Sequence, residues 1–194
     1  MPSAGRARHV LTSPLSTEDV MSVRCGDRVL LSGVVFSARD AAHKRMVAAL
    51  ECGEPLPFDP AGQVIYYMGP SPAPPRRVIG AAGPTTSARM DVHAPALYEA
   101  GIKATIGKGP RSEAVRRAIV EHEALYLAAI GGAGALLSRC IKEAAVIAYA
   151  ELGPEAVRRL VVENLPVIVV NDAHGDDLYE KARQGQAGAR ADEE

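Results

Sequence analysis

Apolar runs alternate with helix-like segments along most of this chain, and no other feature limits its possible folds as strongly. Four runs combine β-branched, aromatic or leucine side chains and end at glycine or serine, as strands often do. They cover residues 28–36, 64–68, 103–106 and 125–130. The segments 40–50, 94–100 and 112–123 lie between these runs and have helical composition. Strands that alternate with helices predict an α/β fold with a mainly parallel sheet.

We expect one domain at residues 9–180, between two short terminal segments. The 194 residues, 47% of them hydrophobic, suit a single domain with a buried core. Residues 1–8 are small, basic and polar, which predicts a flexible start, and residues 181–194 lack periodic apolar positions, which predicts a disordered tail. Within the domain, the pattern predicts a short helix at 154–161 and a last strand at 167–170.

The charge balance excludes several classes of partner. The chain has 22 basic and 23 acidic side chains, and its net charge is −1. Binding to polyanions needs a clear excess of basic residues, so we expect no interaction with nucleic acid or with an acidic membrane surface. The longest uncharged run, 124–138, is too short to span a bilayer. No apolar segment of the secretory type opens the sequence, which predicts a cytoplasmic protein.

Three cysteines, Cys25, Cys52 and Cys140, are widely spaced and form no CxxC or Cys/His motif. An odd number at this spacing predicts neither a disulfide framework nor a metal site built from this chain alone. We interpret them as small buried side chains in a reducing compartment.

Two segments place cations and hydrogen-bonding groups where an apolar run ends. In the first, Arg39 precedes a helix that Asp40 is expected to cap, and His43 follows one turn later. Arg39 and His43 are four residues apart and can therefore face one site. A cation and an imidazole at a helix start suit carboxylate binding and proton transfer. An ordinary capped surface helix is the alternative.

The second segment, GPTTSARMD at 83–91, contains three consecutive hydroxyls at Thr85, Thr86 and Ser87. Arg89 adds a planar fork that suits a carboxylate. A threonine hydroxyl is a weak base, so removal of a proton by Thr85 requires an activating environment. Helix capping by these hydroxyls is the alternative.

Glycines flank Lys108 in the segment IGKGP at 106–110. The backbone can approach an anion closely there, and the lysine supplies a point charge. The spacing is not that of a Walker A loop, and a simple turn is the alternative. We interpret the glycine run at 131–134 as close packing and the polar run at 171–177 as a solvated turn rather than a metal loop.

Taken together and in this order, these segments resemble the β subunit, or C-terminal domain, of class I fumarases and L(+)-tartrate dehydratases. The matching stretches are GDRVLLSG, RDAAHKR, LPFD with YYMGP, GPTTSARMD, IGKGP, the glycine run, and PVIVV with HGDDLY. They span roughly residues 8 to 180, and their combination is more specific than any single stretch. The resemblance implies a swivelling β/β/α three-layer domain, which is an α/β fold with a mixed sheet and helices.

The resemblance also implies a division of labour between two subunits. The reaction would be the reversible hydration of a C4 dicarboxylate, fumarate to (S)-malate, at a 4Fe–4S cluster. An α subunit would bind that cluster, which agrees with the lack of a cluster motif in this chain. The two subunits would form a hetero-oligomer, and the isolated chain is expected as a homodimer.

Carried over residue by residue, the motifs imply particular roles at the shared site. The residues implied to bind the substrate carboxylates are Arg39, Thr86, Arg89 and Lys108. Thr85 would remove the proton next to a carboxylate, and His43 is the second candidate for that role. Cations near a developing aci-carboxylate would stabilise its extra negative charge.

Two other functions are compatible with the same motifs. A β subunit of L(+)-tartrate dehydratase, which converts tartrate to oxaloacetate, shares the same motifs. A non-catalytic domain that binds dicarboxylates or another subunit is the alternative from a different class of protein.

Overall fold

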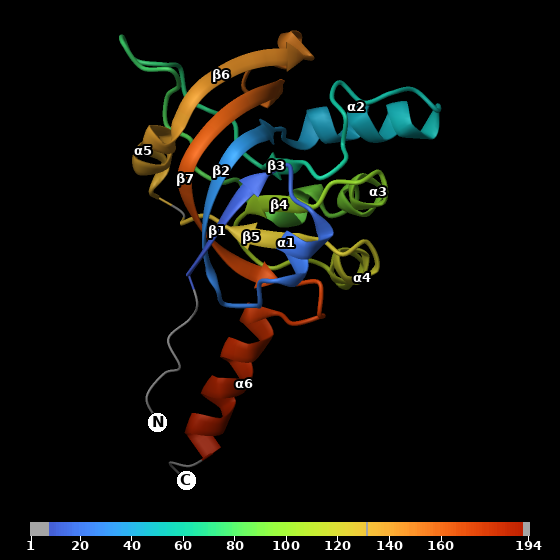
Figure 1. The fold of residues 1–194 in the computed structure, drawn as a ribbon, viewed down its shortest axis with the longest axis vertical. Coiled ribbons are helices and arrows are strands. Elements are labelled where there is room, and N and C mark those ends of the chain that lie inside the picture. The colour runs from blue at the N-terminus through green and yellow to red at the C-terminus, as the bar shows by residue number, and fades with distance from the viewer. Residues whose placement is uncertain (1–7, 131, 192–194) are drawn as a thin grey trace.

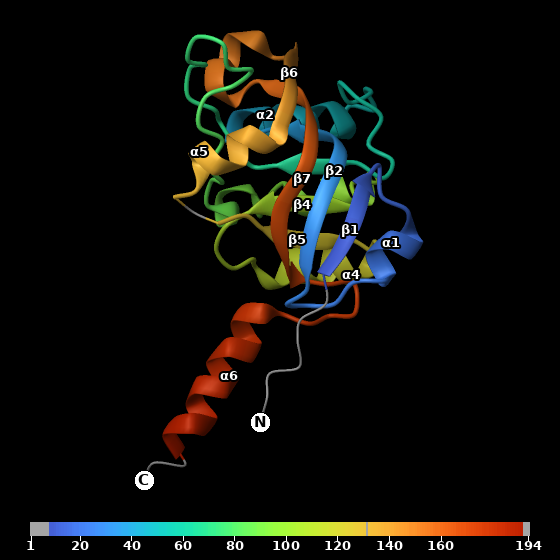
Figure 2. The ribbon, with the colours of Figure 1, turned by 60° about the vertical axis from the view of Figure 1, so that its left-hand side comes forward.

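Parallel and antiparallel strands join in one mixed sheet (Figures 1 and 2). The computed structural model describes residues 8–130 and 132–191 of the 194. The strands are β1 (Arg8–Ser13), β2 (Arg28–Ser37), β3 (Val64–Tyr66), β4 (Ala104–Gly107), β5 (Leu125–Ala128), β6 (Ile141–Ala148) and β7 (Val157–Asn171). They follow the order β1-β2-β3-β4-β5-β7-β6, and β2 also pairs with β7. The strands β2, β3, β4, β5 and β7 therefore form a closed ring.

The parallel half of the sheet carries the crossover helices. Parallel pairing joins β1 to β2, β2 to β3, β3 to β4 and β4 to β5. The crossovers contain α2 (Asp40–Glu51), α3 (Ala94–Glu99) and α4 (Glu113–Glu121), which stack on one side of the sheet in Figure 1. β7 runs antiparallel to β2, β5 and β6. The predicted α/β fold with a mixed sheet and helices is confirmed.

Two apolar cores divide the molecule into three layers. Val64 and Tyr66 of β3 belong to the first core, which also contains buried residues of β2 and β7. Ile65, between them in sequence, belongs to the second core, which lies under α2, α3 and α4. Because side chains alternate across a strand, β3 is buried on both faces, and β5 alternates in the same way. The arrangement is a β/β/α sandwich in which the short parallel strands form the middle layer.

The remaining elements are short, apart from the last helix. They are α1 (Thr17–Met21), α5 (Gly134–Leu137), α6 (Leu178–Ala191) and the 3₁₀ turns η1 (Ser87–Met90), η2 (Ser138–Cys140) and η3 (Ala150–Glu155). Ser16 begins α1 with a capping box, in which its hydroxyl and the carboxylate of Asp19 each accept from the other residue's backbone N–H. Within the described residues, no helix is both long and apolar enough to cross a membrane.

The structure differs from the sequence prediction at 154–161. The expected helix is absent, and β7 instead begins at Val157 and continues for 15 residues. Leu160 and Val162 are buried in the first core, and their strand pairs with β2 on one edge and β6 on the other. Local composition could not reveal those partners, because β2 lies more than 120 residues earlier in the sequence.

The chain ends also differ in part from the prediction. Arg8 already belongs to β1, whereas the rest of the predicted flexible start, residues 1–7, lies outside the described residues. Of the predicted tail at 181–194, residues 181–191 belong to α6, and residues 192–194 lie outside the described residues. Several alanine, glutamine and arginine residues in this stretch favour helix even without a periodic apolar face.

Candidate active site

The segments that follow β2, β3 and β4 lie together at one edge of the middle layer. The N–H of Ala38, just after β2, donates to the carbonyl of Tyr66 at the end of β3 (3.2 Å). The N–H of Tyr67 donates to the carbonyl of Ile106 in β4 (2.8 Å). These bonds bring together the carboxyl ends of parallel strands, where ligands commonly bind in α/β folds.

The hydroxyl run lies against the lysine loop. Thr85 donates its N–H to the carbonyl of Tyr67 (2.7 Å), and Thr86 forms an isolated parallel bridge with Lys108. Ser87 donates its N–H to the carbonyl of Lys108 (2.9 Å), and its Oγ accepts the N–H of Lys108 (3.1 Å). A Cβ on Gly107 would lie 1.9 Å from this Oγ, so only glycine permits the contact. The side chains of Thr86 and Lys108 are exposed, and that of Thr85 is half-buried.

One carboxylate joins the two predicted arginines. Asp40 Oδ1 accepts the Nε–H of Arg89 (2.8 Å), and Asp40 Oδ2 lies 3.5 Å from Nη2 of Arg39. Glu155 Oε1, from η3, lies 3.3 Å from the same Nη2. Asp40 was expected to cap α2, but Arg39 occupies the N-cap position and Asp40 turns its side chain to Arg89. Neither Asp40 nor Glu155 was predicted as part of the site.

His43 lies beneath this group and has no solvent exposure. Its Nδ1 lies 2.9 Å from the carbonyl oxygen of Arg39, and its ring meets Tyr67 edge to face at 5.1 Å between centroids. Burial lowers the pKa of His43 to about 4, although the hydrogen bond to Arg39 opposes the shift. Because a carbonyl only accepts, the neutral ring carries its proton on Nδ1, and the buried Nε2 has no partner among the described residues.

The structure therefore brings all six predicted residues to one edge of the sheet, in two connected groups. One group contains Arg39, His43 and Arg89, and the other contains Thr85, Thr86 and Lys108. The segment from Thr85 to Arg89 belongs to both. Cations and hydroxyls at a strand-end edge, with a neutral imidazole below them, form an arrangement that can bind a small dianion.

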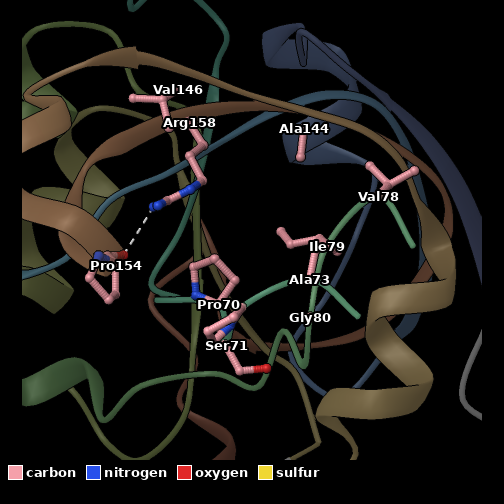
Figure 3. Close-up of a pocket in the computed structure, with 11 residues that line it drawn as sticks. Pro70, Ser71, Ala73, Val78, Ile79, Gly80, Ala144, Val146, Pro154 and Arg158 are labelled. Carbon is pink, nitrogen blue, oxygen red and sulfur yellow. Dashed lines mark hydrogen bonds between the residues drawn. The ribbon is translucent and has the colours of Figure 1, made fainter. Parts of the chain in front are cut away.

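A cavity of about 350 Å³ lies beside this edge and has a different character (Figure 3). It lies between the proline-rich loop at 70–80 and strands β6 and β7. Its one charged lining residue, Arg158, turns its guanidinium away to the carbonyls of Gly153, Pro154 and Ala156, at 2.7 to 3.1 Å. Because these carbonyls occupy three of the five N–H donors of Arg158, most of its hydrogen-bonding capacity is directed to the backbone rather than to an anion in the cavity.

The cysteines do not fit an iron–sulfur cluster. Cys25 Sγ donates to the carbonyl of Val170, Cys140 Sγ lies near the carbonyl of Asn164, and Cys52 follows α2. Burial raises the pKa of the Cys25 thiol to about 11, which opposes the thiolate form that binds iron. In the described part of the chain, no three His, Cys, Asp or Glu residues form a group that could hold a metal ion.

With this fold and this edge in place, comparison with known sequences defines the class of protein. The family described as the fumarase C-terminus matches residues 3–182, and the chain belongs to that family. Among individual relatives, fumarate hydratase 2 of Leishmania major is 40% identical over 159 residues, which are 80% of this chain and 28% of that protein. The putative L(+)-tartrate dehydratase subunit beta of Methanocaldococcus jannaschii is 38% identical over 176 residues, 88% of this chain and 90% of that subunit.

A third relative is, like the first, a fumarate hydratase. The aerobic class I fumarate hydratase of Escherichia coli is 35% identical over 161 residues, 82% of this chain and 29% of that enzyme. The chain thus spans under a third of the length of these fumarate hydratases and nearly all of the tartrate dehydratase subunit. Both kinds of relative are hydro-lyases by name.

Proposed function

We propose that this chain is the β subunit of a class I fumarate hydratase and catalyses, with an α subunit, the reversible hydration of fumarate to (S)-malate. The observation that carries the proposal is the linkage of Arg39 and Arg89 through Asp40, next to the hydroxyl run and Lys108. Three cations at one edge match the two carboxylates of a C4 substrate. Family membership supports the same chemistry.

Each proposed residue has a definite task in this scheme. Asp40 holds the Nε–H of Arg89, which leaves the terminal nitrogens of Arg89 to meet a carboxylate as a fork. Arg39 and Lys108 bind the remaining carboxylate charge, and Thr86 donates a hydrogen bond. Thr85 accepts the proton from the carbon next to a carboxylate, and the surrounding cations stabilise both its alkoxide and the developing aci-carboxylate.

The iron–sulfur cluster is proposed to belong to the α subunit. The three cysteines lie in separate parts of the chain, with Cys25 between α1 and β2, Cys52 directly after α2 and Cys140 in η2, which supports placing the cluster on another chain. We therefore propose a hetero-oligomer in which the edge with Arg39, Arg89 and Lys108 faces the partner. The chain alone is expected to be inactive.

An assay of the anaerobically reconstituted complex tests this function. Malate, fumarate and L(+)-tartrate are offered side by side to the chain alone, to the cluster-bearing partner alone and to both together. We expect fumarate hydration only in the mixture, and Arg89→Ala should lower kcat/KM roughly 100-fold or more. Arg117→Ala, which removes an exposed arginine whose ionic partner among the described residues is Glu113 on the same helix, serves as control and should retain activity. Hydratase activity of the chain alone would contradict the need for an α subunit. A mixture that contains the iron–sulfur cluster but acts on none of the three acids would contradict hydro-lyase function.

L(+)-tartrate dehydration is the second candidate, and one observation favours it. The tartrate dehydratase subunit matches this chain over nearly its whole length, as a separate subunit should. In the same assay, turnover of L(+)-tartrate to oxaloacetate with little turnover of malate would replace fumarate by tartrate and leave the residue roles unchanged.

The proton acceptor is tested by two substitutions. Thr85→Val removes the hydroxyl and should abolish exchange of the malate C3 proton with solvent, whereas Thr85→Ser should retain part of it. His43→Asn keeps a donor toward the Arg39 carbonyl and should retain exchange. Full exchange in Thr85→Val together with its loss in His43→Asn would move the role to His43.

A further inference from the structure

Arg111 is buried between two aromatic rings, behind the edge that carries the proposed substrate cations. Its side chain has 0% exposure. The guanidinium carbon lies 5.3 Å from the ring centroid of Tyr67 and 4.8 Å from that of Tyr126. Nη1 donates to Thr105 Oγ1 (3.1 Å), and Nη2 lies 3.4 Å from the Tyr67 hydroxyl. Arg111 follows directly after the segment IGKGP and belongs to none of the candidate motifs of the sequence.

The Nε–H of Arg111 donates to Asp91 Oδ1 at 2.7 Å. The other carboxylate oxygen of Asp91 accepts the N–H of Ser112 at 2.6 Å. Asp91 lies two residues after Arg89, and Arg111 lies three residues after Lys108. The pair therefore joins the turn that carries one proposed cation to the loop that carries another.

A second set of bonds connects the same two segments. Ser87 Oγ lies 2.9 Å from the hydroxyl of Tyr126, which donates to the carbonyl of Gly109 (2.8 Å). Tyr126 also forms one wall of the Arg111 site. The turn and the loop are thus connected at two places, the hydroxyl run and the Asp91–Arg111 ion pair. Tyr126 takes part in both, because it bonds to Ser87 and also packs against Arg111.

Stability alone gives a poor account of this arrangement. Burial opposes the charge on Arg111, but the neighbouring tyrosines and Asp91 raise its pKa above the ordinary value, so the guanidinium remains charged. Apolar side chains of similar volume often stabilise a core as well as a buried ion pair does. A planar fork, by contrast, fixes direction and distance between the groups that it joins.

We propose that Asp91 and Arg111 are positioning residues that set the spacing between Arg89 and Lys108 for a C4 dicarboxylate. This inference rests on the proposed function and deepens it by naming the residues that fix the distance between Arg89 and Lys108. Neither Asp91 nor Arg111 touches the substrate in this scheme. Their loss should therefore weaken substrate binding without removing a reacting group.

The test compares Asp91→Asn and Arg111→Lys with two matched control variants. Asp177→Asn and Arg116→Lys alter another acid–arginine pair, 3.4 Å apart, which joins α4 to the start of α6. Both pairs contain a largely buried carboxylate, but only Asp91–Arg111 connects the proposed cations. Kinetics are measured on the reconstituted complex with malate and fumarate.

We expect KM to rise roughly 10- to 100-fold in Asp91→Asn and in Arg111→Lys, because small displacements of binding groups cost rates and affinity of this size. A purely structural role would lower the fraction of folded protein, and with it the apparent kcat, at unchanged KM. The double variant should be no worse than the poorer single variant, because the two residues act as one unit. Asp91→Asn preserves side-chain shape and carries the test if Arg111→Lys does not fold.

A measurement on the isolated chain separates this inference from the proposed function. Amide hydrogen exchange at Ser87 and Lys108 reports the turn–loop contact directly, without substrate or partner. We expect faster exchange at both amides in Asp91→Asn and Arg111→Lys, and wild-type exchange in the two controls. Unchanged KM in an active complex, or unchanged exchange, would overturn the positioning role. An inactive wild-type complex together with faster exchange in the variants would instead contradict the proposed hydro-lyase function. It would still support a role of Asp91 and Arg111 in holding the turn against the loop.

Discussion

His43 shows how burial changes the role of a residue that the sequence marks as titratable. Its ring is fully enclosed, its Nδ1 is bound to the Arg39 carbonyl, and its pKa is lowered to about 4. A neutral, enclosed imidazole is better suited to hold the start of α2 than to exchange protons with solvent. This geometry supports Thr85 over His43 as the proposed proton acceptor.

The low pKa of His43 predicts a pH-dependent loss of stability. Between its ordinary pKa of about 6.5 and its folded pKa of about 4, the unfolded chain binds a proton at His43 that the folded chain does not. Stability should therefore fall as the pH drops through this window, by up to about 3 kcal/mol from this group alone. The measurement is the free energy of unfolding in urea at pH 7 and at pH 4.5.

His43→Asn identifies the residue responsible for that pH dependence. The variant should be less stable at pH 7 but lose less stability on acidification than the wild type. His122→Asn, at the end of α4 and outside the site, controls for the loss of an imidazole as such. An identical acid-induced loss in wild type and His43→Asn would show that other groups cause it.

The sequence was informative about single residues and less so about their connections. Arg39, Arg89 and Lys108 were each marked as cations that follow an apolar run, where ligands often bind in α/β folds, but their place in one shared site was implied only by the family resemblance. Asp40 was visible as an acid at a helix start but was assigned to capping rather than to Arg89. Arg111 and Asp91 are 20 residues apart, so their ion pair depends on how two crossovers pack.

At the scale of elements, β7 is the part of the fold that local pattern predicts least well. Residues 158–163 alternate weakly and contain three charges, a composition that helices also tolerate. The strand is selected by its partners, since β2 and β6 offer hydrogen bonds along both edges. By contrast, β2, β4, α2, α3 and α4 were predicted within a few residues, because local apolar pattern and end signals agree there.

Opposite sides of the β6–β7 pair should respond very differently to truncation. Leu160→Ala removes a side chain with 0% exposure from the first core and should cost about 2–5 kcal/mol of unfolding free energy. Glu143→Ala removes only an exposed cross-strand partner of Arg159 and should change stability by less than about 1 kcal/mol. Urea unfolding of both variants checks the contrast. Comparable effects would mean that Leu160 is not a core residue of β7.

For the whole molecule, the residues at 171–177 connect the sheet to the last helix. The sequence predicted a solvated turn, but Asn171, Asp172 and Asp177 are buried. Asp172 Oδ2 accepts the N–H of Cys25 (2.7 Å), and its Oδ1 accepts the N–H groups of His174 and Asp176 (both 3.0 Å). Acidic side chains thus build this corner by accepting backbone hydrogen bonds, and a composition rule that treats acids as solvated cannot foresee it.

Beyond that corner, α6 extends away from the three layers (Figures 1 and 2). The described side chains that attach it belong to its first turn. Leu178 and Tyr179 pack against the second core, under α2, α3 and α4, and Glu180 pairs with Arg116. These contacts divide α6 into an attached start and a projecting remainder.

Two shortened chains should therefore differ sharply in thermal stability. A chain that ends at Lys181 keeps Leu178, Tyr179 and the partners of Arg116, so its Tm should stay within roughly 2 °C of the full chain. A chain that ends at Asn171 loses these contacts and the carboxylate of Asp172, and its Tm should fall by roughly 6–12 °C, as expected for a loss of about 3 kcal/mol. Calorimetry of the three proteins measures the difference. An equal fall in both shortened chains would show that the far part of α6 also contributes to the stability of the domain.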